Sequence, residues 1–493
     1  MKKLTIMLLA FAALFIGCKK ESSEKRILKF EFTTLGVEAT ITEGAKTIVA
    51  QVPENTDVTN LVPTITVSAK ASVDPASGVP QDFTNPKTYV VTAEDGSNTS
   101  YTVTVTKGGG GGGGGGQTTD PTTISDNISA NTTWPDLGLP VDYIIDGYCY
   151  IEGNAMLTIE PGVTVMFASS GSAIIVESDA GIHMVGTPDK HIRFVNPTNN
   201  NNPGAWKRIE VHSNRNDNMM EYVDFINGGS NEDNVLDVSG TLSIKNCLID
   251  GSTGDGIYVS GKLTAFENNT IKNCAGFPLV INHDLLINQI GTGNTYTNNT
   301  KNMIHFDHYW IDNENVATYT FTNQGIPYYL SSGMQVSDAR QLVVNAGCEF
   351  VIAYNREIIA NSDCLIQVNG TASQPVKFRG ETSDAGSWQG VHIYTTRTTN
   401  GGSNLTNCII DGAGIDEDGN LLLNYDTRLN INNLTLSNSG SYGLNIEIPI
   451  DWESDTYDFT NYHVTATGLT FSNCAYGNIW ERAKEVVLNV WPN

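Results

Sequence analysis

The chain is poor in charged residues, and poorest in basic ones. Of its 493 residues only 16% are charged, and 28 Lys and Arg stand against 53 Asp and Glu, which gives a formal net charge of −25. A nucleic-acid binder needs a basic surface, so this balance excludes that class. Collagen periodicity, heptad repeats and repeated membrane-length apolar runs are also missing, which excludes collagens, coiled coils and multispanning membrane proteins.

The cysteines lack the spacing of metal sites. No CxxC pair or Cys/His cluster occurs, and beyond the N-terminus there are seven cysteines, an odd number that cannot all pair. We interpret them as small buried hydrophobic residues and expect no metal or other cofactor. Loops of the EF-hand or nonapeptide-repeat type are absent, so tight Ca²⁺ binding is not indicated, although weak Ca²⁺ binding stays open. The seven are Cys149, Cys247, Cys274, Cys348, Cys364, Cys408 and Cys474.

The first residues have the form of an export signal. Lys2 and Lys3 precede an apolar stretch over residues 4–17, which is shorter than the roughly 20 residues that span a bilayer. The stretch ends in FIGC and resembles a bacterial lipoprotein lipobox, with Phe15 where Leu is the commonest residue. The resemblance implies a signal peptide over 1–17, acylation of Cys18 and a lipid (palmitate) anchor in the outer membrane, at the cell surface. An ordinary signal peptide is the alternative.

Gly (48 residues), Asn and Thr are abundant, which favours many short strands and turns over helices. A charged tether (18–26) leads into residues 27–107, where apolar and polar residues alternate in short runs. About seven such runs predict a β-sandwich. Residues 53–78 and 82–107 resemble the Ig-like, cadherin-like modules of Gram-negative surface lipoproteins, which implies a spacer or interaction domain.

A glycine-rich linker over 108–123 follows the predicted sandwich. It contains nine consecutive glycines, at 108–116, and such a segment behaves as a flexible coil. We therefore expect it to separate the sandwich from everything after it.

The remainder, 124–493, is repetitive. Residues 139–167 recur as 326–352, residues 184–196 as 367–380, and residues 204–212 as 386–394, in the same order. This pattern predicts an internal duplication, with related halves at about 132–310 and 320–493.

A shorter unit of about 22–26 residues repeats within these halves, with an Asn at a constant place in its motif. Such a unit cannot bury its apolar face alone, whereas stacked copies can, as in a parallel β-helix. We expect the asparagines at turns, where their amides hydrogen-bond from one unit to the next. They are Asn246, Asn268, Asn407, Asn433 and Asn473. The segment resembles the right-handed parallel β-helix of the pectin-lyase superfamily, which implies a groove for extended polysaccharide.

Enzymes of that superfamily use clustered carboxylates with a His or a basic residue. Asp250 and Asp255 match part of the hydrolase Asp cluster, but its GHG and Arg-x-Lys elements are absent. Asp307 and His308 lie in a stretch similar to the WIDH strand of the lyases, with His305 in place of Trp and no Arg-x-Pro-x-x-Arg segment. Catalytic roles for these four residues remain candidates against a plain reading as turns and surface strands.

Aromatic residues are the other candidates for ligand contact. Trp206 and Trp388 hold equivalent places in the two repeats, so we expect both to fill the same corner, with stacking on a sugar ring as the alternative. The further aromatics that would line a groove are Tyr309, Trp310, Trp452 and Trp480.

Charge narrows the ligand class. Residues 108–493 carry 17 basic and 42 acidic residues, so the segment repels a polyuronate and favours neutral or Ca²⁺-bridged glycans, unless the charge only aids solubility. The sequence thus predicts a surface-anchored, non-catalytic lipoprotein whose β-helix binds glycan or a surface protein. A divergent polysaccharide lyase or glycoside hydrolase is the alternative.

Overall fold

The computed structural model describes residues 22–44, 46–52, 56–107, 120–197, 200–361, 363–394, 402–424, 427–447, 450–451, 456–457, 463–481 and 486–488. Cys18, most of the glycine linker and Trp452 lie outside these residues. Over the described ranges the regular elements are β-strands and three short 3-10 helices, which confirms the all-β prediction. The helices are η1 (Val58–Asn60), η2 (Ser230–Glu232) and η3 (Asp284–Asn288). No helix in this part of the chain has the length and apolarity needed to cross a membrane.

The chain forms two compact units, residues 1–117 and 118–493. The first unit contains a three-stranded sheet, in the order β2-β1-β5, and a five-stranded sheet, in the order β3-β4-β8-β7-β6. Both sheets contribute to one core, in which Phe30 packs edge-to-face on Tyr89 at 5.3 Å. The strands are β1 (Ile27–Phe32), β2 (Val37–Glu38), β3 (Thr40–Thr42), β4 (Thr47–Val52), β5 (Thr64–Val67), β6 (Ser72–Asp74), β7 (Lys87–Thr92) and β8 (Asn98–Lys107).

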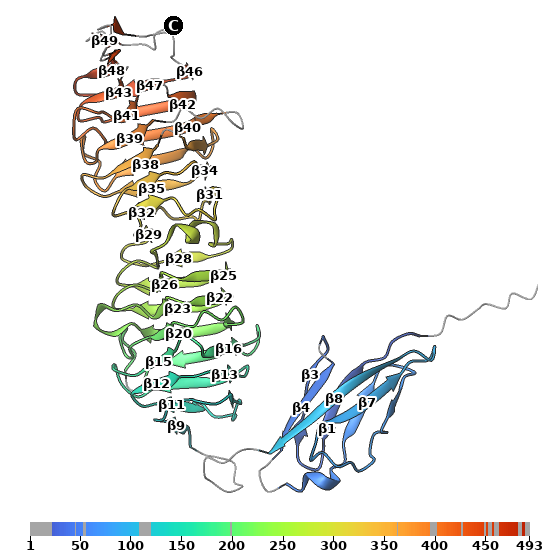
Figure 1. Ribbon diagram of the computed structural model, residues 1–493. Helices are drawn as coiled ribbons and strands as arrows, with labels where there is room; N and C mark the ends of the chain where they lie inside the picture. Colours follow the sequence, from blue (N-terminus) through green and yellow to red (C-terminus); the bar gives the residue numbers. More distant parts are fainter. Residues whose placement is uncertain are drawn as a thin grey trace, which may run out of the picture. The chain divides into compact units, whose positions relative to one another are not determined.

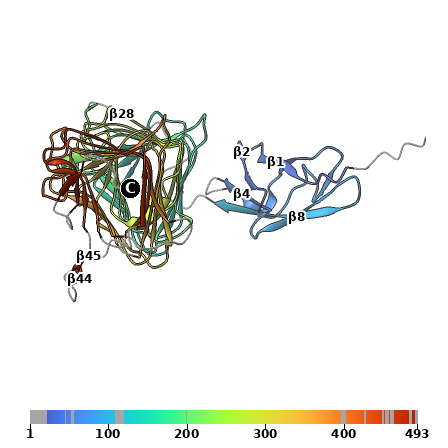
Figure 2. The same ribbon diagram turned by 90° about the horizontal axis from the view of Figure 1, so that it is seen from above.

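The second unit is a stack of short parallel strands, consistent with a β-helix (Figures 1 and 2). Its early turns place strands in three sheets. Sheet 1 holds β9 (Thr122–Ile124), β11 (Tyr143–Ile145), β14 (Thr164–Phe167), β17 (Ile192–Val195), β20 (Val223–Gly228), β23 (Leu248–Ser252), β26 (Thr270–Cys274) and β28 (Thr295–Thr297). Sheet 3 holds β10 (Thr132–Trp134), β13 (Met156–Ile159), β16 (Gly181–Val185), β19 (Met219–Glu221), β22 (Thr241–Lys245) and β25 (Lys262–Glu267).

Sheet 2 runs through the whole stack. It holds β12 (Tyr148–Ile151), β15 (Ala173–Val176), β18 (Ile209–Val211), β21 (Leu236–Val238), β24 (Ile257–Val259), β27 (Leu279–Ile281), β29 (Ile304–Phe306), β31 (Thr318–Phe321), β32 (Tyr328–Leu330), β34 (Gln341–Asn345), β35 (Glu349–Ile352), β37 (Leu365–Asn369), β38 (Val376–Gly380), β40 (Ser403–Asp411), β42 (Arg428–Ser437), β46 (His463–Thr467) and β47 (Thr470–Ser472). The long strands β40 and β42 each pair along two lines of shorter strands, which joins both lines into this one sheet.

Sheet 4 belongs to the later turns. It holds β30 (Trp310–Ile311), β33 (Met334–Val336), β36 (Glu357–Ala360), β39 (Gly390–Ile393), β41 (Leu421–Leu423), β43 (Tyr442–Ile446), β48 (Gly477–Glu481) and β49 (Val486–Leu488). Several of these strands follow one another along the left edge of the stack in Figure 1. A separate short pair, β44 (Ile450–Asp451) and β45 (Thr456–Tyr457), lies beside the stack in Figure 2.

Alternate side chains of each strand point inward and stack on those of the next turn. Phe194 lies between Phe167 and Phe225, with ring centroids 6.0 and 5.4 Å away. One hydrophobic cluster extends in this way from Ile128 to Ile479. Each such side chain contributes about 1.5–3 kcal/mol on burial, so the stack is stabilised turn by turn along its length.

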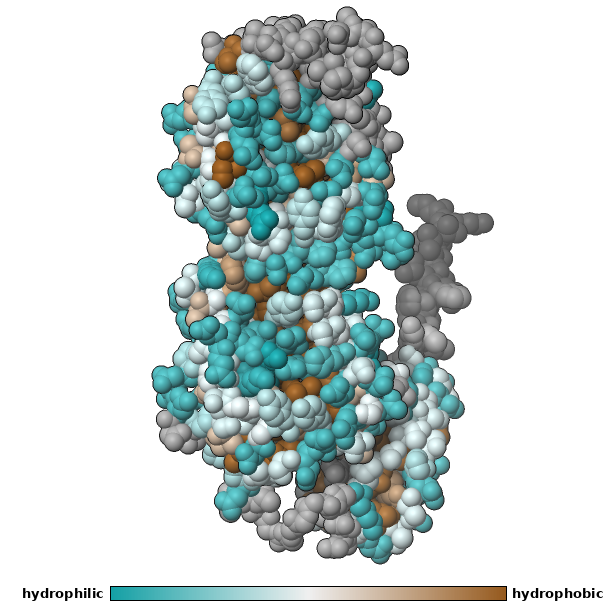
Figure 3. Space-filling view, turned by 60° about the vertical axis from the view of Figure 1, so that its left-hand side comes forward, coloured by the Kyte–Doolittle hydropathy of each residue, from teal (hydrophilic) through white to brown (hydrophobic). Residues whose placement is uncertain are grey.

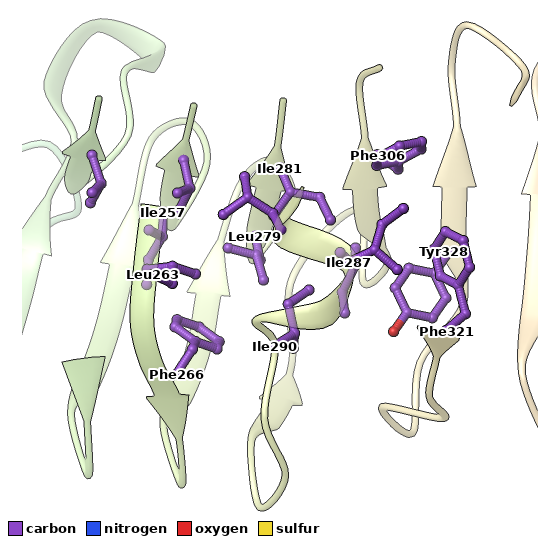
Figure 4. Packing of buried hydrophobic residues seen from close by; sticks show 14 of the residues in the cluster. Ile257, Leu263, Phe266, Leu279, Ile281, Ile287, Ile290, Phe306, Phe321 and Tyr328 are labelled. Carbon is purple, nitrogen blue, oxygen red and sulfur yellow. The ribbon is translucent and has the colours of Figure 1, made fainter. Parts of the chain in front are cut away.

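The sheets change at a junction near residues 284–321. Sheets 1 and 3 end at β28 and β25, sheet 4 begins at β30, and sheet 2 continues through β27, β29 and β32. The helix η3 lies between β25 and β31, and Ile287 of this helix joins the core beside Phe321 (Figure 4). Its buried Asp284 accepts hydrogen bonds from the Tyr319 hydroxyl (2.5 Å) and the Asn313 N–H (3.1 Å), which fixes the helix to the next turn.

The five recurring asparagines all lie at corners with left-handed backbone. Their φ angles run from 46° at Asn407 to 57° at Asn433, a region that Asn adopts more readily than most residues. The Asn433 amide donates to Asn407 Oδ1 at 3.2 Å. Among the described residues, this is the side-chain hydrogen bond that joins two of the five asparagines. Other corner amides donate to different groups, as when Asn246 donates to Glu221 Oε1 at 3.2 Å and Asn473 to Asn438 Oδ1 at 3.1 Å.

A second set of asparagines forms a network inside the stack. Asn269 is fully buried, accepts the Cys247 N–H at 3.0 Å and donates to the Ile244 carbonyl at 3.1 Å. Asn294 and Asn299 make similar bonds on the next turn. These amides, buried at Asn269 and Asn299 and partly exposed at Asn294, therefore tie successive turns together, alongside the corner residues that carry the sequence motif.

Candidate functional site

The two equivalent tryptophans are core residues. Trp206 and Trp388 are fully buried, and each indole N–H donates to a backbone carbonyl, of Ile226 at 2.8 Å and of Asp411 at 2.9 Å. Trp206 also stacks on Phe167 with ring centroids 4.4 Å apart. Neither indole has a face open to a sugar ring, so the stacking alternative is wrong for both.

Asp250 and Asp255 each bond the next turn of the stack. Asp250 accepts from the Asn273 amide at 2.6 Å and lies 3.2 Å from the Lys272 ammonium. Asp255 accepts the Phe277 N–H at 2.7 Å, and burial raises the pKa of its carboxyl. Both carboxylates are thus held by hydrogen bonds between turns of the stack, as expected for residues with a structural role.

Asp307 and His308 also make separate contacts. Asp307 accepts from the Ser331 hydroxyl at 3.0 Å, and that hydroxyl lies 2.7 Å from His305 Nε2. His308 instead stacks on His283 at 5.8 Å, and burial lowers the pKa of its imidazole. Neighbouring residues of an extended chain point to opposite sides, which separates the two side chains. Across the described ranges no group of three His, Cys, Asp or Glu side chains is placed to hold a metal ion.

Tyr309 and Trp310 begin the outer face of sheet 4. The Tyr309 hydroxyl donates to Gln335 Oε1 at 3.1 Å, and Trp310 is 47% exposed. Their rings meet edge-to-face at 5.0 Å. The two residues thus place an accessible indole and a fixed phenol at one end of this sheet.

Strand register aligns one side chain from each of seven strands of sheet 4 into a single column, which we call the outer column and in which His392, Leu422 and Asn445 are buried. It consists of Trp310, Gln335, Ile359, His392, Leu422, Asn445 and Trp480. Six inter-strand steps of about 4.8 Å place the two tryptophans about 29 Å apart. Trp480, one of the aromatics named from the sequence, therefore lies at the opposite end of the same face from Trp310.

Two depressions border the outer column. The first, of about 460 Å³, is lined by Tyr309, Ser332, Asn355, Arg356, Glu357 and Gln389. The second, of about 320 Å³, is lined by Glu417, Asp418, Tyr442, Asn445, Glu447, Tyr476 and Trp480. We call the outer column and these depressions together the sheet-4 groove. Figure 3 turns the left-hand side of the stack forward and shows a mostly hydrophilic surface with apolar patches in it.

Aromatic rings form a platform in the second depression. Tyr442 stacks on Trp480, with centroids 5.2 Å apart and ring planes 18° apart. Tyr476, which is 59% exposed, meets Tyr442 edge-to-face at 5.6 Å. Rings that bring an apolar face and a polar tip to the surface suit ligands that are apolar on one side and polar at their rim.

Two buried polar side chains of the groove have an unsatisfied atom. Asn445, 5% exposed, donates to the Glu417 carbonyl at 3.2 Å, but its Oδ1 has no hydrogen-bond partner among the described residues. His392, 4% exposed, has Nδ1 3.3 Å from Glu357 Oε2, and its Nε2 has no hydrogen-bond partner in the described chain but faces Asp418 Oδ2 at 3.9 Å. Because a buried unpaired polar atom costs about 1–3 kcal/mol, the Asn445 oxygen points to a bound group that completes it.

The groove is acidic. The turn 416–418 supplies three carboxylates, and Glu357 and Glu447 add two more, whereas Arg356 is the one basic residue that lines either depression within the described chain. Gln389 bonds Asn355 Oδ1 at 3.3 Å and Asp416 Oδ2 at 3.4 Å, which links the first depression to this turn.

Most of the groove was not predicted. Tyr442, Asn445 and Glu357 carry no local motif, and only the alignment of distant strands brings them to one face. Besides the aromatics Tyr309, Trp310 and Trp480, the run Asp416-Glu417-Asp418 was a visible signal, because three adjacent carboxylates are unusual in a chain so poor in charge.

Comparison with known proteins relates the N-terminal unit to a family. Residues 27–105 match the N-terminal family of surface glycan-binding proteins, "SGBP, N-terminal". No curated protein matches the chain. Among solved structures, a candidate glycoside hydrolase from Bacteroides thetaiotaomicron is 33% identical over 18% of this chain and 26% of its own, with a TM-score of 0.16. The N-terminal unit is thus similar to surface glycan-binding proteins, which supports a glycan-related role for the chain at a cell surface.

Proposed function

We propose that the protein is a surface-anchored lipoprotein that binds glycan without cleaving it, and that the sheet-4 groove is its glycan-binding face. The observation that carries this proposal is the pairing of the Tyr442–Trp480 platform with the buried, unpartnered Oδ1 of Asn445 in one depression. The match of residues 27–105 to surface glycan-binding proteins supports it independently.

The groove chemistry suits a saccharide. Aromatic faces pack against the C–H faces of sugar rings, while carboxylates and the Asn445 carbonyl oxygen accept hydrogen bonds from sugar hydroxyls. Both depressions border one column about 29 Å long, so an extended chain of several sugars would contact both at once.

The proposal includes the finer architecture. Residues 27–107 would form an Ig-like spacer, and 124–493 a right-handed β-helix of the pectin-lyase type with an internal duplication. The identical hydrogen-bonding role of Trp206 and Trp388 supports the duplication. The chain would be fixed to the outer membrane through lipidated Cys18, outside the described residues.

A polysaccharide panel tests binding. The purified protein is assayed by affinity electrophoresis in gels that contain each polymer, and each polymer is assayed for new reducing or unsaturated ends. We expect at least one polymer to retard the protein without being cleaved, and the Trp480→Ala variant to lose most of that retardation. Tyr148→Ala is the matched control, because Tyr148 is 43% exposed but lies on sheet 2.

Each other outcome contradicts a part of the proposal. Cleavage of a polymer would favour the lyase or hydrolase hypothesis. An equal loss of retardation in both variants would show that the sheet-4 groove is not the binding site. Retardation by no polymer would favour a surface protein as the partner.

Anchoring is tested separately. Cys18→Ala should abolish labelling by a fatty-acid analogue and release the protein from the membrane fraction, because acyl chains at this residue supply the anchor. A variant that stays membrane-bound would overturn the lipobox interpretation.

A further inference from the structure

We infer that the sheet-4 groove selects uncharged glycans and rejects polyuronates, an inference that rests on the proposed glycan-binding function.

The unsatisfied oxygen of Asn445 requires a donor. Asn445 Oδ1 is an amide oxygen, which only accepts hydrogen bonds. His392 adds no such acceptor, because its two ring nitrogens face carboxylates, Glu357 Oε2 at 3.3 Å and Asp418 Oδ2 at 3.9 Å. A sugar hydroxyl donates to the Asn445 oxygen, whereas an ionised carboxylate group placed there has no proton to give.

The charges along the groove oppose an anionic ligand. The carboxylates of Glu417 and Asp418 line the second depression beside the aromatic platform, and no Lys or Arg lines that depression among the described residues. In the first depression Glu357 accompanies Arg356, so that pair adds no net positive charge. A uronate bound on the platform would lie within the Debye length of about 10 Å at 0.1 M salt from several like charges.

Neutral saccharides meet the same carboxylates favourably. Their hydroxyls donate to ionised oxygens in charge-assisted hydrogen bonds, which are roughly twice as strong as those to neutral acceptors. The charges of the turn 416–418 therefore strengthen binding of an uncharged sugar and weaken binding of a uronate. This is selection by attraction and repulsion from the same groups.

The test uses a matched pair of ligands made from one polymer. Neutral polysaccharides that carry free primary hydroxyls (glucans, mannans and galactans) and polyuronates (polygalacturonate and alginate) are screened by affinity electrophoresis with EDTA present. The neutral polymer that binds best is then oxidised at its primary hydroxyls to carboxylates, and both forms are titrated at 0.05 and 0.5 M NaCl.

We expect the oxidised form to bind at least about tenfold more weakly at low salt, and the gap to narrow at high salt because screening weakens repulsion. Binding of the neutral form should change little with salt. A polyuronate that binds as tightly as the best neutral polymer would overturn the inference. So would an oxidised polymer whose loss of affinity is the same at both salt concentrations. Either result would leave glycan binding itself intact. If no polymer of either kind binds, the proposed function itself fails.

A pair of variants assigns the effect to the groove. In the double variant Glu417→Gln with Asp418→Asn, the ratio between the affinities for the neutral and the oxidised polymer should become several-fold smaller. Asp126→Asn with Glu232→Gln removes the same charge at exposed sites of early turns and should leave the gap unchanged. Equal narrowing in both variants would mean that net charge, and not the groove, sets the preference.

Discussion

Replacing Trp388 by Phe separates the structural role of this residue from a role in ligand contact. The indole is fully buried, and its N–H donates to the Asp411 carbonyl at 2.9 Å. Phe keeps an aromatic ring in the core but removes the donor and about a third of the ring atoms. The change therefore tests packing and hydrogen bonding together, at a site far from solvent.

The expected destabilisation has two parts. Loss of the buried ring atoms costs about 1–2 kcal/mol in transfer free energy. The Asp411 carbonyl loses its indole donor in the interior, which costs about 1–3 kcal/mol more. The free energy of unfolding should therefore fall by about 2–5 kcal/mol in the Trp388→Phe variant. It should fall by a similar amount in the Trp206→Phe variant, because Trp206 is equally buried and makes the same type of hydrogen bond.

Urea denaturation followed by far-UV circular dichroism measures this change. Trp134→Phe is the control, because Trp134 is buried against Tyr143 but its indole donates to no described residue, so only the transfer cost of about 1–2 kcal/mol applies. Glycan retention should be unchanged in all three variants. Destabilisation below about 1 kcal/mol for Trp388→Phe, or a selective loss of glycan binding, would refute the reasoning.

Three further predictions concern stability, pH and thiol chemistry. Asp142 is fully buried and accepts three backbone N–H groups, so Asp142→Ala should cost about 3–6 kcal/mol in urea denaturation, and more than Asp142→Asn, which keeps one acceptor oxygen. Burial, and secondarily the charge of Asp136, raise the pKa of Glu160 in the folded state, so its contribution to stability is lost as pH rises through that pKa. Glu160→Gln should therefore raise the melting temperature at pH 7 and have no effect well below pH 4.5; a lowered value at pH 7 would contradict this. Burial raises the thiol pKa of Cys149 to about 11 and of Cys247 to about 12, so mass spectrometry after brief iodoacetamide treatment at pH 8 should find Cys474, the half-buried cysteine, alkylated first.

Local sequence patterns predicted those features of the fold that depend only on residues within one turn of the stack, such as its strands and its corners. Alternation along residues such as Val165 and Phe167 marks inward and outward positions directly, and the recurring Asn marks the left-handed corner that few other residues tolerate. The equivalence of Trp206 and Trp388 likewise predicted a shared structural role. These features depend on backbone sterics and on burial, which short sequence motifs record.

The junction and the groove were not predicted, because both depend on contacts between distant residues. Asp284 is fixed by Tyr319, 35 positions later, and nothing around either residue signals the partner. Asn445 and Trp480 are brought together by strand register across a long connecting segment. A sequence pattern gives the inward or outward direction of each side chain, but not which turns come to lie next to each other.

The change of sheets at the junction has a consequence for how the stack unfolds. Within the described chain, backbone pairing crosses this region through sheet 2 alone, where β29 pairs with β27 and β32 over three residues each. In a repeat structure cooperativity passes only between neighbouring turns, so a narrow hydrogen-bonded bridge weakens the transmission. The turns before and after η3 are therefore expected to behave as two foldons, each melting as a block, with amide exchange fastest where they meet.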